Sequence, residues 1–486
     1  MSESHRQIFK STSITGGASA ITLLAGMGKI KVLALLGGPV AVGVMGLLQN
    51  VLTATATVAG CGLASSGIRA IAAHADEPAR VAALWKSLLW ASLALGFGAG
   101  LALVLAGDEL GALLLGRRLS TEECLLLSLG VIATLLFTTH TALLQGLRRI
   151  GDLAIVNITA SVVGAMTSLV PIYLELPHAV LWFVVIAPVT SALFAYVALR
   201  WRRLLPQDSV PDAAAISELG HLFKLGIPIM AASAVTLGTQ LAARALIANR
   251  LGLEASGHFQ AAWSISTTYI GFILSAMAAD YFPRLSAMSD RPKEAAKLVN
   301  QQAEMALTMA APFVLAIIAF SPQAITALYS SKFTGAFDLL RWQALGDILK
   351  ILCWPIGYIL LSTGRGKLFI AAEAIWSITY LGLMYLFIDQ MKLNIAGIGF
   401  VGAYVVLLLY LTLSGKLLIN YLISARNFLF MIALLIIGVV IIQTTTIGNA
   451  VYLHATLVLV VALYTLWRLD QLVNLRELIR NRLARL

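Results

Sequence analysis

Charged residues are scarce in this sequence, and their scarcity excludes most soluble folds. Only 12% of the 486 residues are charged, whereas 59% are hydrophobic and the mean hydropathy is +0.88. A typical soluble domain has about 25% charged residues. Apolar runs of about 20 residues, long enough to cross the hydrocarbon core of a bilayer, recur along the chain. The composition therefore predicts an integral membrane protein.

Long polar segments are missing as well. The widest polar gaps, around Arg200–Lys224 and Pro283–Lys297, span about 15 to 25 residues, and a domain needs at least about 50. This excludes an enzyme with a catalytic domain outside the membrane. We find no Walker motif, zinc-ligand spacing or nucleophile elbow, so we expect no ATP hydrolysis, no enzyme activity and no cofactor. The first apolar run is too long for a cleavable signal peptide.

Cysteine is rare, which limits metal and disulfide chemistry. Cys61, Cys124 and Cys353 lie in or beside apolar runs at unrelated spacings. Ligand or disulfide frameworks need paired cysteines at regular spacings. We interpret the three as small packing residues.

Basic residues outnumber acidic ones by 34 to 23, yet their distribution argues against a nucleic-acid partner. They cluster in alternate loops between the apolar runs, and the other loops hold far fewer. The clusters are Arg69/Arg80/Lys86, Arg148/Arg149, Arg200/Arg202/Arg203, Arg284/Arg291/Lys293/Lys297, Arg365/Lys367 and Lys416/Arg426. By the positive-inside rule, this asymmetry predicts that both termini lie in the cytoplasm.

The stretch from Ser11 to Pro78 has a diverged second copy later in the chain, which makes it an internal repeat. A shift of 214 positions superimposes four pairs without a gap: Gly38 and Gly252, Gly43 and Gly257, Asp76 and Asp290, and Pro78 and Pro292. We count six apolar spans in each half, and an even number gives the halves the same orientation. They should be related by an axis along the membrane normal, with a binding site at their interface.

We therefore predict an all-α polytopic membrane protein with about fourteen transmembrane helices. Two pseudo-symmetric six-helix lobes, residues 1–205 and 206–423, are followed by an extra transmembrane hairpin at 424–468. The basic tail at 469–486 suits an amphipathic helix on the anionic inner leaflet, with an ordinary packed or solvated tail as the alternative.

Polar residues recur on one face of the first two apolar helices in each half, at spacings of three and four. The candidates for a cavity lining are Ser19, Thr22, Asn50, Thr53, Ser233, Thr236, Gln240, Ser264 and Thr267. Small and hydroxyl residues in membrane helices usually serve close helix packing, and for any single residue that alternative stays open. We call this row of polar residues the polar stripe. Because the whole stripe recurs in the second half, we favour a cavity wall.

In each half, a basic residue lies at the end of the row of polar residues on the first apolar helix. Lys29 lies about seven residues before the break at Gly37-Gly38-Pro39, and Arg244 lies one turn after Gln240. A cation inside an apolar helix costs about 2.5 to 3.5 kcal/mol on insertion and marks a candidate site for an anion. Snorkelling to the surface is the alternative for Lys29 and the favoured interpretation for Lys31.

Four further ionisable residues are embedded in predicted spans: Asp280, Asp347, Lys350 and Glu373. They are candidates for a charge network or for coupling to a proton or sodium gradient. Asp347 and Lys350 lie three apart on a helix, so a private ion pair is the alternative. For Asp280 and Glu373, the alternative is an ion pair with a neighbouring arginine.

Several stretches resemble one transporter superfamily. The opening Leu36-Gly37-Gly38-Pro39-Val40-Ala41-Val42-Gly43, followed by Gln49-Asn50, resembles the multidrug/oligosaccharidyl-lipid/polysaccharide exporters. Four other stretches resemble the Wzx-type O-antigen translocases of that superfamily: Thr57-Val58-Ala59-Gly60-Cys61-Gly62-Leu63, Phe259-Gln260-Ala261-Ala262-Trp263, Ala279-Asp280-Tyr281-Phe282-Pro283-Arg284-Leu285 and Leu340-Arg341-Trp342-Gln343. The resemblance covers nearly the whole chain.

The resemblance implies a two-lobed bundle that alternates between inward-open and outward-open states. It implies a flippase that moves an undecaprenyl-pyrophosphate-linked O-antigen repeat unit across the bacterial inner membrane. Lys29 or Lys31, and Arg244, match the family's cavity cations of the first and seventh spans. The other partners we expect are membrane lipids, the polysaccharide polymerase and the chain-length regulator. Many relatives have twelve spans, and the extra hairpin is similar to that of the fourteen-span lipid II flippases.

Other functions remain as alternatives. A multidrug antiporter of the same superfamily would favour acidic cavity residues, against which the basic stripes argue. A flippase for another lipid-linked glycan, such as lipid II, fits the same cations. A polymerase or ligase acting on the lipid is disfavoured because no large outer loop is present.

Overall fold

The computed structural model describes residues 3–204, 212–288, 290–446 and 450–473. The chain folds into two compact units. Unit 1 comprises Met1–Gly257 and Leu328–Ser330, and unit 2 comprises His258–Ala327 and Ser331–Leu486. All regular secondary structure of the described residues is helical, which confirms the all-α class. The assignment of residues to two lobes by sequence repeat stays a prediction.

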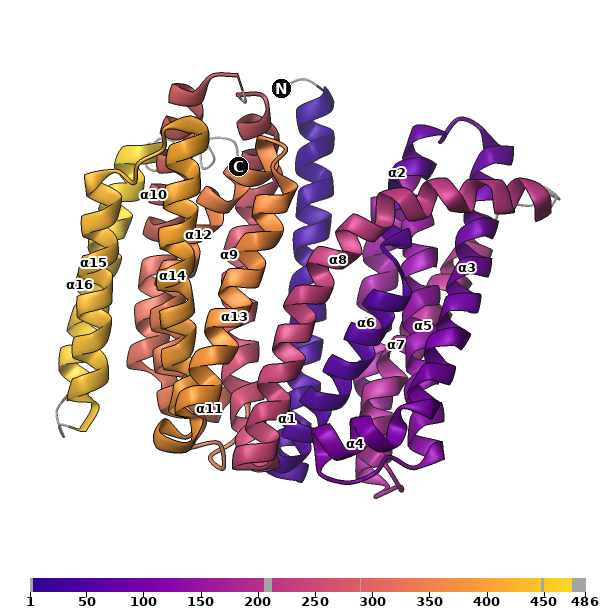
Figure 1. Ribbon diagram of the computed structural model, residues 1–486, viewed down its shortest axis with the longest axis horizontal. Helices are drawn as coiled ribbons and strands as arrows, with labels where there is room; N and C mark the ends of the chain where they lie inside the picture. The colour runs from indigo at the N-terminus through magenta and orange to yellow at the C-terminus, as the bar shows by residue number, and fades with distance from the viewer. Residues whose placement is uncertain (1–2, 205–211, 289, 447–449, 474–486) are drawn as a thin grey trace, which may run out of the picture. The chain divides into compact units, whose positions relative to one another are not determined.

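Unit 1 is a bundle of long helices with two short ones at its ends (Figure 1). The helices are α1 (Glu3–Ala59), α2 (Leu63–Ala73), α3 (Pro78–Leu105), α4 (Gly107–Leu115), α5 (Thr121–Gly146), α6 (Ile150–Tyr173), α7 (Ala179–Trp201) and α8 (Asp212–Leu251). Helix α8 crosses one end of the unit and then descends, so that it packs against α1, α2, α3 and α4. A capping box between Ser120 and Glu123 starts α5.

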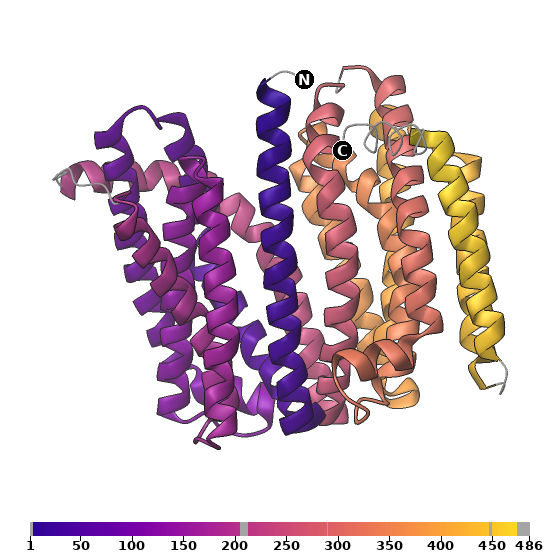
Figure 2. The same cartoon turned by 180° about the vertical axis from the view of Figure 1, so that it is seen from behind.

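Helix α1 contains the first predicted span and most of the second, and the chain reverses within it at Gly38. The backbone there has a φ of 65°, which a residue with a Cβ rarely adopts, and Pro39 follows. Figure 2 shows the first part of α1 running the length of unit 1 before the chain turns back. The break expected at Gly37-Gly38-Pro39 is confirmed.

The second copy of this break lies between α8 and α9 (Leu253–Ser286). Gly252, the repeat equivalent of Gly38, has a φ of 89°. The equivalent glycines Gly43 and Gly257 meet at this end of unit 1: a Cβ on Gly43 would collide with the Gly257 backbone, and one on Gly257 would collide with the carbonyl oxygen of Pro39. The repeat therefore brings its own two copies into backbone contact.

Unit 2 contains α9 from His258 onward and the remaining helices. These are α10 (Pro292–Ala319), α11 (Ser321–Leu328), α12 (Ala336–Ser362), α13 (Gly366–Met391), α14 (Asn394–Ile419), α15 (Ala425–Gln443), the 3-10 turn η1 (Thr444–Thr446) and α16 (Ala450–Val473). Helices α3 and α10 both have 28 residues and begin at the repeated proline. Helices α10, α12 and α14 form the core, on which α15 packs.

A buried carboxylate fastens the C-terminal hairpin to unit 2. Glu304 of α10 accepts hydrogen bonds from Arg426 at the start of α15 (2.7 Å) and from Arg468 of α16 (2.6 and 2.9 Å). The two arginines offset the free-energy cost of burying the Glu304 carboxylate, and the loss of any one of the three would leave a charge without its partner. No local sequence pattern predicts this cluster.

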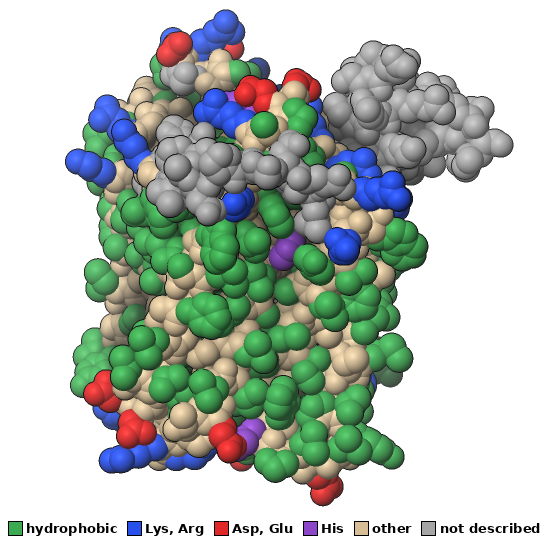
Figure 3. All heavy atoms as spheres, turned by 90° about the vertical axis from the view of Figure 1, so that its right-hand side faces the viewer, with side chains coloured by type: hydrophobic (Ala, Val, Ile, Leu, Met, Phe, Trp, Pro, Cys, Tyr) green, Lys and Arg blue, Asp and Glu red, His purple; other side chains and the backbone are tan. Residues whose placement is uncertain are grey.

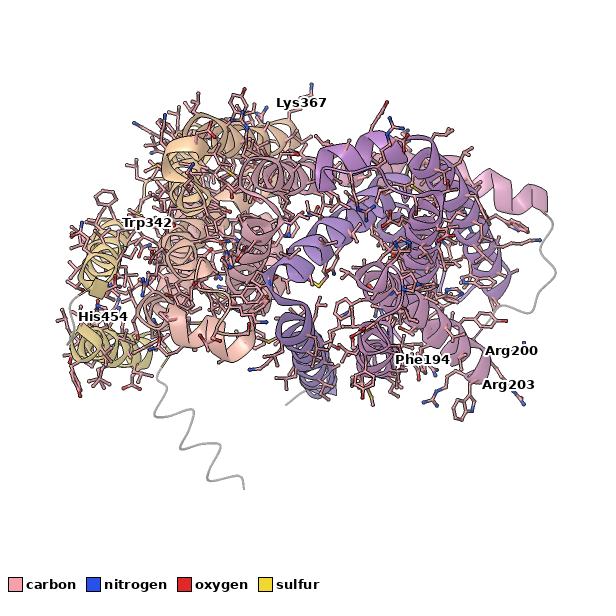
Figure 4. The ribbon with its side chains drawn as sticks, turned by 90° about the horizontal axis from the view of Figure 1, so that it is seen from below. Phe194, Arg200, Arg203, Trp342, Lys367 and His454 are labelled. Carbon is pink, nitrogen blue, oxygen red and sulfur yellow. The ribbon has the colours of Figure 1, made fainter. Side chains whose placement is uncertain are left out.

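The protein is a multi-pass membrane protein. Eleven helices of the described residues are long and apolar enough to cross a bilayer, with α1 counted once. Figure 3 shows a face with a hydrophobic belt between two charged rims. Arg200 and Arg203 point away from the helices of unit 1, and Lys367 points away from those of unit 2 (Figure 4). The count of fourteen spans stays a prediction, and most of the tail at 469–486 lies outside the described residues.

Candidate functional site

Lys29 lies inside unit 1 over an aromatic ring. Its side chain is half-buried, and its ammonium is 4.9 Å from the ring centroid of Phe183 on α7. Among the residues that the structure describes, no carboxylate forms an ion pair with it. A desolvated cation on a ring gains about 2 kcal/mol, less than a direct anionic partner would supply. Lys29 is therefore a cation whose charge no carboxylate of the described residues compensates.

Arg244 is the second cation of unit 1 and is nearly enclosed, with 4% of its surface exposed. It lies on α8, which packs against α1, the helix that holds Lys29. Its burial excludes an orientation toward lipid. Lys31 is half-buried on α1.

A pocket of about 490 Å³ lies between α1, α5, α6 and α7 of unit 1. Its wall includes the predicted Ser19 and Thr22, together with Asn157, Ser161 and Ser191. The hydroxyl oxygen of Thr22 is buried and has no hydrogen-bond partner among the described residues. All five polar groups are uncharged, so the pocket suits a neutral, hydrogen-bonding ligand.

Sequence reasoning missed three of these residues. Asn157 and Ser161 are four apart on the predicted fifth span, and Ser191 lies on the sixth. The spacing was a usable signal, because residues four apart share a helix face. These spans lie beyond the stretch in which the repeat is ungapped, so the repeat did not point to them.

Other predicted lining residues satisfy their polar groups locally. The hydroxyls of Thr53 and its repeat equivalent Thr267 donate to the carbonyls four residues earlier, at 2.7 and 2.8 Å. Gln260 donates to Ser264 at 2.8 Å. These contacts favour the packing alternative for Thr53 and Thr267.

The remaining stripe residues differ in burial. The side-chain oxygen of Asn50 is buried and has no hydrogen-bond partner among the described residues. On α8, Ser233 is exposed, whereas Thr236 and Gln240 are half-buried. A cavity between the two predicted lobes stays a prediction.

Unit 2 encloses the carboxylate of Asp347, which is fully buried on α12. One of its oxygens accepts hydrogen bonds from Ser266 (2.7 Å) and from the hydroxyl of Tyr269, both on α9. The other oxygen has no partner among the described residues. Asp347 and Lys350 form no salt bridge, and the Lys350 ammonium lies 5.9 Å from the ring centroid of Phe400.

A second pocket, of about 270 Å³, lies between α12, α13 and α14 of unit 2. Lys350 and Glu373 provide its charges, and Trp354, Tyr358 and Tyr404 provide most of its aromatic wall. The pocket brings together two predicted residues, Lys350 and Glu373, that belong to different helices. Asp280 cannot be placed with them, because its side chain lies outside the described residues.

The two pockets occupy equivalent places in the repeat. From α5 onward the shift is 216 positions, which superimposes Gly130 of α5 on Gly346 of α12, and Arg149 on Arg365, the residues that precede α6 and α13. The same shift superimposes Asn157 on Glu373. No group of three metal-ligating side chains occurs within the described ranges.

Comparison with known proteins identifies relatives over most of the chain. The profile of a family described as polysaccharide biosynthesis protein matches residues 32–338. The lipid III flippase of Escherichia coli strain K12 is 24% identical over 366 residues, which are 75% of this chain and 87% of that protein.

Solved structures share the fold. The lipid II flippase MurJ in an inward closed conformation superimposes with a TM-score of 0.70 at 15% identity, covering 96% of this chain and 99% of that one. An inward-facing multidrug resistance MATE family transporter of the MOP superfamily gives 0.66 at 16% identity, covering 88% and 96%. The resemblance to the exporter superfamily is confirmed, and the narrower likeness to O-antigen translocases stays a prediction.

Proposed function

Because this chain belongs to the polysaccharide biosynthesis protein family, we propose that it is a flippase for a lipid-linked oligosaccharide. The cargo we propose is an undecaprenyl-pyrophosphate-linked O-antigen repeat unit, moved across the bacterial inner membrane by alternating access. The distribution of basic residues supports cytoplasmic termini. Candidate partners are the polysaccharide polymerase and the chain-length regulator.

The observation that carries the proposal is the half-buried cation of unit 1, Lys29. Lys29 lies in an apolar helix, over Phe183 and without an acidic partner among the described residues. A diphosphate cannot cross hydrocarbon unaided, and a cation in a low-dielectric cavity stabilises it. Arg244 adds a forked set of donors that matches phosphate oxygens.

The neutral pocket of unit 1 suits the sugars of the cargo. Its hydroxyl and amide groups can exchange hydrogen bonds with sugar hydroxyls without holding them as tightly as charges would. Transport also requires that the cargo bind differently in the two states.

Translocation in vesicles tests the proposal. Lys29→Met keeps the length of the side chain over Phe183 but removes the charge, and we expect at least a tenfold loss of translocation of a pyrophosphate-linked oligosaccharide. Lys29→Arg should retain part of the activity, and Lys332→Ala, which removes an exposed cation, should retain all of it. Full activity of both Lys29→Met and Arg244→Ala, at normal membrane abundance, would refute the proposed phosphate site.

Asp347 is our candidate for coupling to a proton gradient. A fully buried carboxylate with one unpartnered oxygen gains from binding a proton or a cation. Asp347→Asn keeps an acceptor for Ser266 and Tyr269 but cannot ionise, so stimulation of transport by a pH gradient should disappear. Stimulation that persists in this variant would show that another residue couples transport to the proton gradient. The same comparison with a sodium gradient tests coupling to sodium.

The lipid III flippase relative supports a second cargo of the same class. Vesicles carrying lipid-linked sugars of different sequence, each on the same pyrophosphate lipid, separate an O-antigen unit from other glycans. A drug-susceptibility panel tests the multidrug alternative, which the absence of acidic side chains from the described wall of the unit 1 pocket disfavours.

A further inference from the structure

We propose that the pocket between α12, α13 and α14 of unit 2 binds one pyranose ring of the translocated glycan. This inference rests on the proposed flippase function and names a sugar subsite within it. The pocket of about 270 Å³ has about nine times the liquid volume of one water molecule, which is room for a single sugar ring.

The walls of the pocket are aromatic and rigid. Trp354, Tyr358, Phe369 and Tyr404 line it. The rings of Trp354 and Tyr358 are 5.0 Å apart, and Tyr281 packs against both at 5.7 Å. The carbon-bound hydrogens of a pyranose carry a small positive charge, so a sugar face packs well on the negative face of an aromatic ring. Rings that fix one another present this surface without a large loss of side-chain freedom.

The polar groups of the pocket select a neutral, hydroxylated ligand. Lys350 of α12 is half-buried and has no hydrogen-bond acceptor among the described residues, while Glu373 of α13 supplies a carboxylate to the same space. Glu373 disfavours a diphosphate, and Lys350 disfavours a cationic drug. A sugar hydroxyl can accept from the lysine, and another can donate to the carboxylate, so a pyranose uses both.

The repeat has other residue types at the equivalent positions of unit 1. The shift of 216 positions superimposes Lys350 on Thr134 and Trp354 on Thr138. The hydroxyls of both threonines donate to carbonyls of their own helix, at 2.8 Å. Unit 1 therefore has small neutral residues at these two helix positions, and the cation and the indole of unit 2 are additions that a ligand explains.

Saturation-transfer difference NMR on the full chain in lipid nanodiscs tests the proposal. The probes are methyl glucopyranoside, methyl galactopyranoside and methyl 2-acetamido-glucopyranoside, with glycerol as the non-binding reference. We expect transfer to the ring protons of at least one pyranoside. In Lys350→Thr and Trp354→Thr, which install the residues of unit 1, the transfer should fall at least fivefold.

The matched control is Glu294→Gln, which removes an exposed charge that is paired with Arg291 at the surface of unit 2. Its signal should equal that of the wild type. If Trp354→Thr fails to fold, Lys350→Thr and Glu373→Asn carry the test, since Asn is the unit 1 residue at that position. No transfer in the wild type, or equal transfer in the wild type and the folded variants, would overturn the proposal.

A transport arm separates this inference from the proposed function. Lys350→Thr should slow vesicle translocation of a lipid with a full oligosaccharide more than that of a lipid with a single sugar, whereas Lys29→Met should slow both. Wild-type translocation without pyranoside binding would refute the subsite and leave the flippase. No wild-type translocation of either lipid would refute the flippase and, with it, the glycan as the ligand of this pocket.

Discussion

Helices α3 and α10 have equivalent places in the repeat and opposite surroundings. Trp90 and Phe97 of α3 are 59% and 65% exposed, whereas the equivalent Glu304 and Ala311 of α10 are 7% and 2% exposed. The hairpin of α15 and α16 packs on α10 and has no counterpart in the repeat. An apolar ring suits a face open to lipid, whereas a carboxylate is tolerable only where arginines reach it.

The two pockets also differ in chemistry although they occupy equivalent places in the repeat. Asn157 of the unit 1 pocket is replaced by Glu373 in the unit 2 pocket, and both pockets persist. The repeat thus specifies a backbone arrangement that accepts neutral or charged linings. Chemistry can therefore differ between the halves without a change of fold.

The largest effect should come from Glu304→Ala. Removing the acid leaves the buried end of Arg468, together with Arg426, without a counter-charge, at a cost of about 3 to 5 kcal/mol. Thermal unfolding of the protein in lipid nanodiscs measures the loss. Glu294→Ala, at an exposed ion pair, should change stability by less than about 1 kcal/mol. Equal unfolding temperatures for the two variants would show that Glu304 does not hold the hairpin.

Charging the neutral pocket should cost somewhat less. Asn157→Glu places a carboxylate in a pocket whose described wall holds no cation, and we expect a loss of about 2.5 to 3.5 kcal/mol at most, by insertion scales. Adding Thr134→Lys recreates the opposite charges of unit 2 and should recover part of the stability. The unfolding temperatures of the single and double variants test this, and a double variant no better than the single one would contradict the equivalence of the pockets.

Substitution of either glycine at the backbone contact between Gly43 and Gly257 should lower stability. A methyl group on Gly257 would meet the carbonyl oxygen of Pro39, so Gly257→Ala should destabilise by about 1 to 3 kcal/mol. Gly43→Ala should behave in the same way, because it fills the same contact from the other side. The control is Gly238→Ala on α8, where a Cβ has open space and alanine favours the helix. Loss in only one of the two crossing variants would contradict a shared contact.

The smallest effect should come from Trp90→Leu. This side chain is exposed on α3, so a change to another apolar residue should alter stability by less than about 0.5 kcal/mol. Unfolding in nanodiscs again provides the measurement. A loss comparable to that of Glu304→Ala would show that a partner covers this face of α3 in the membrane.

Much of the fold could be predicted because its signals are local. Gly38 and Pro39 predicted a break that the structure contains, and the repeated proline marked the starts of α3 and α10. Hydrophobic length alone identified the membrane helices, since a bilayer leaves a chain few alternatives to the helix. Glu304, by contrast, has its partners more than a hundred positions away, and no local pattern connects them.

The candidate site was predictable only in part for a related reason. Ser19 and Thr22 repeat without a gap, but the shift changes from 214 to 216 positions before Asn157 and Glu373, which hides their equivalence. A pocket also needs three or four helices, and a sequence gives the face of one helix at a time.

The sequence by itself determined that this chain is a helical membrane protein with a repeat, because hydrophobic length and glycine position act within a few turns of one helix. Only the tertiary structure decided which buried groups meet. It placed Lys29 over Phe183, Glu304 between two arginines, and Lys350 in an aromatic pocket. The physical reason is that the energy of a buried charge depends on its neighbours in space, and those neighbours come from distant parts of the chain.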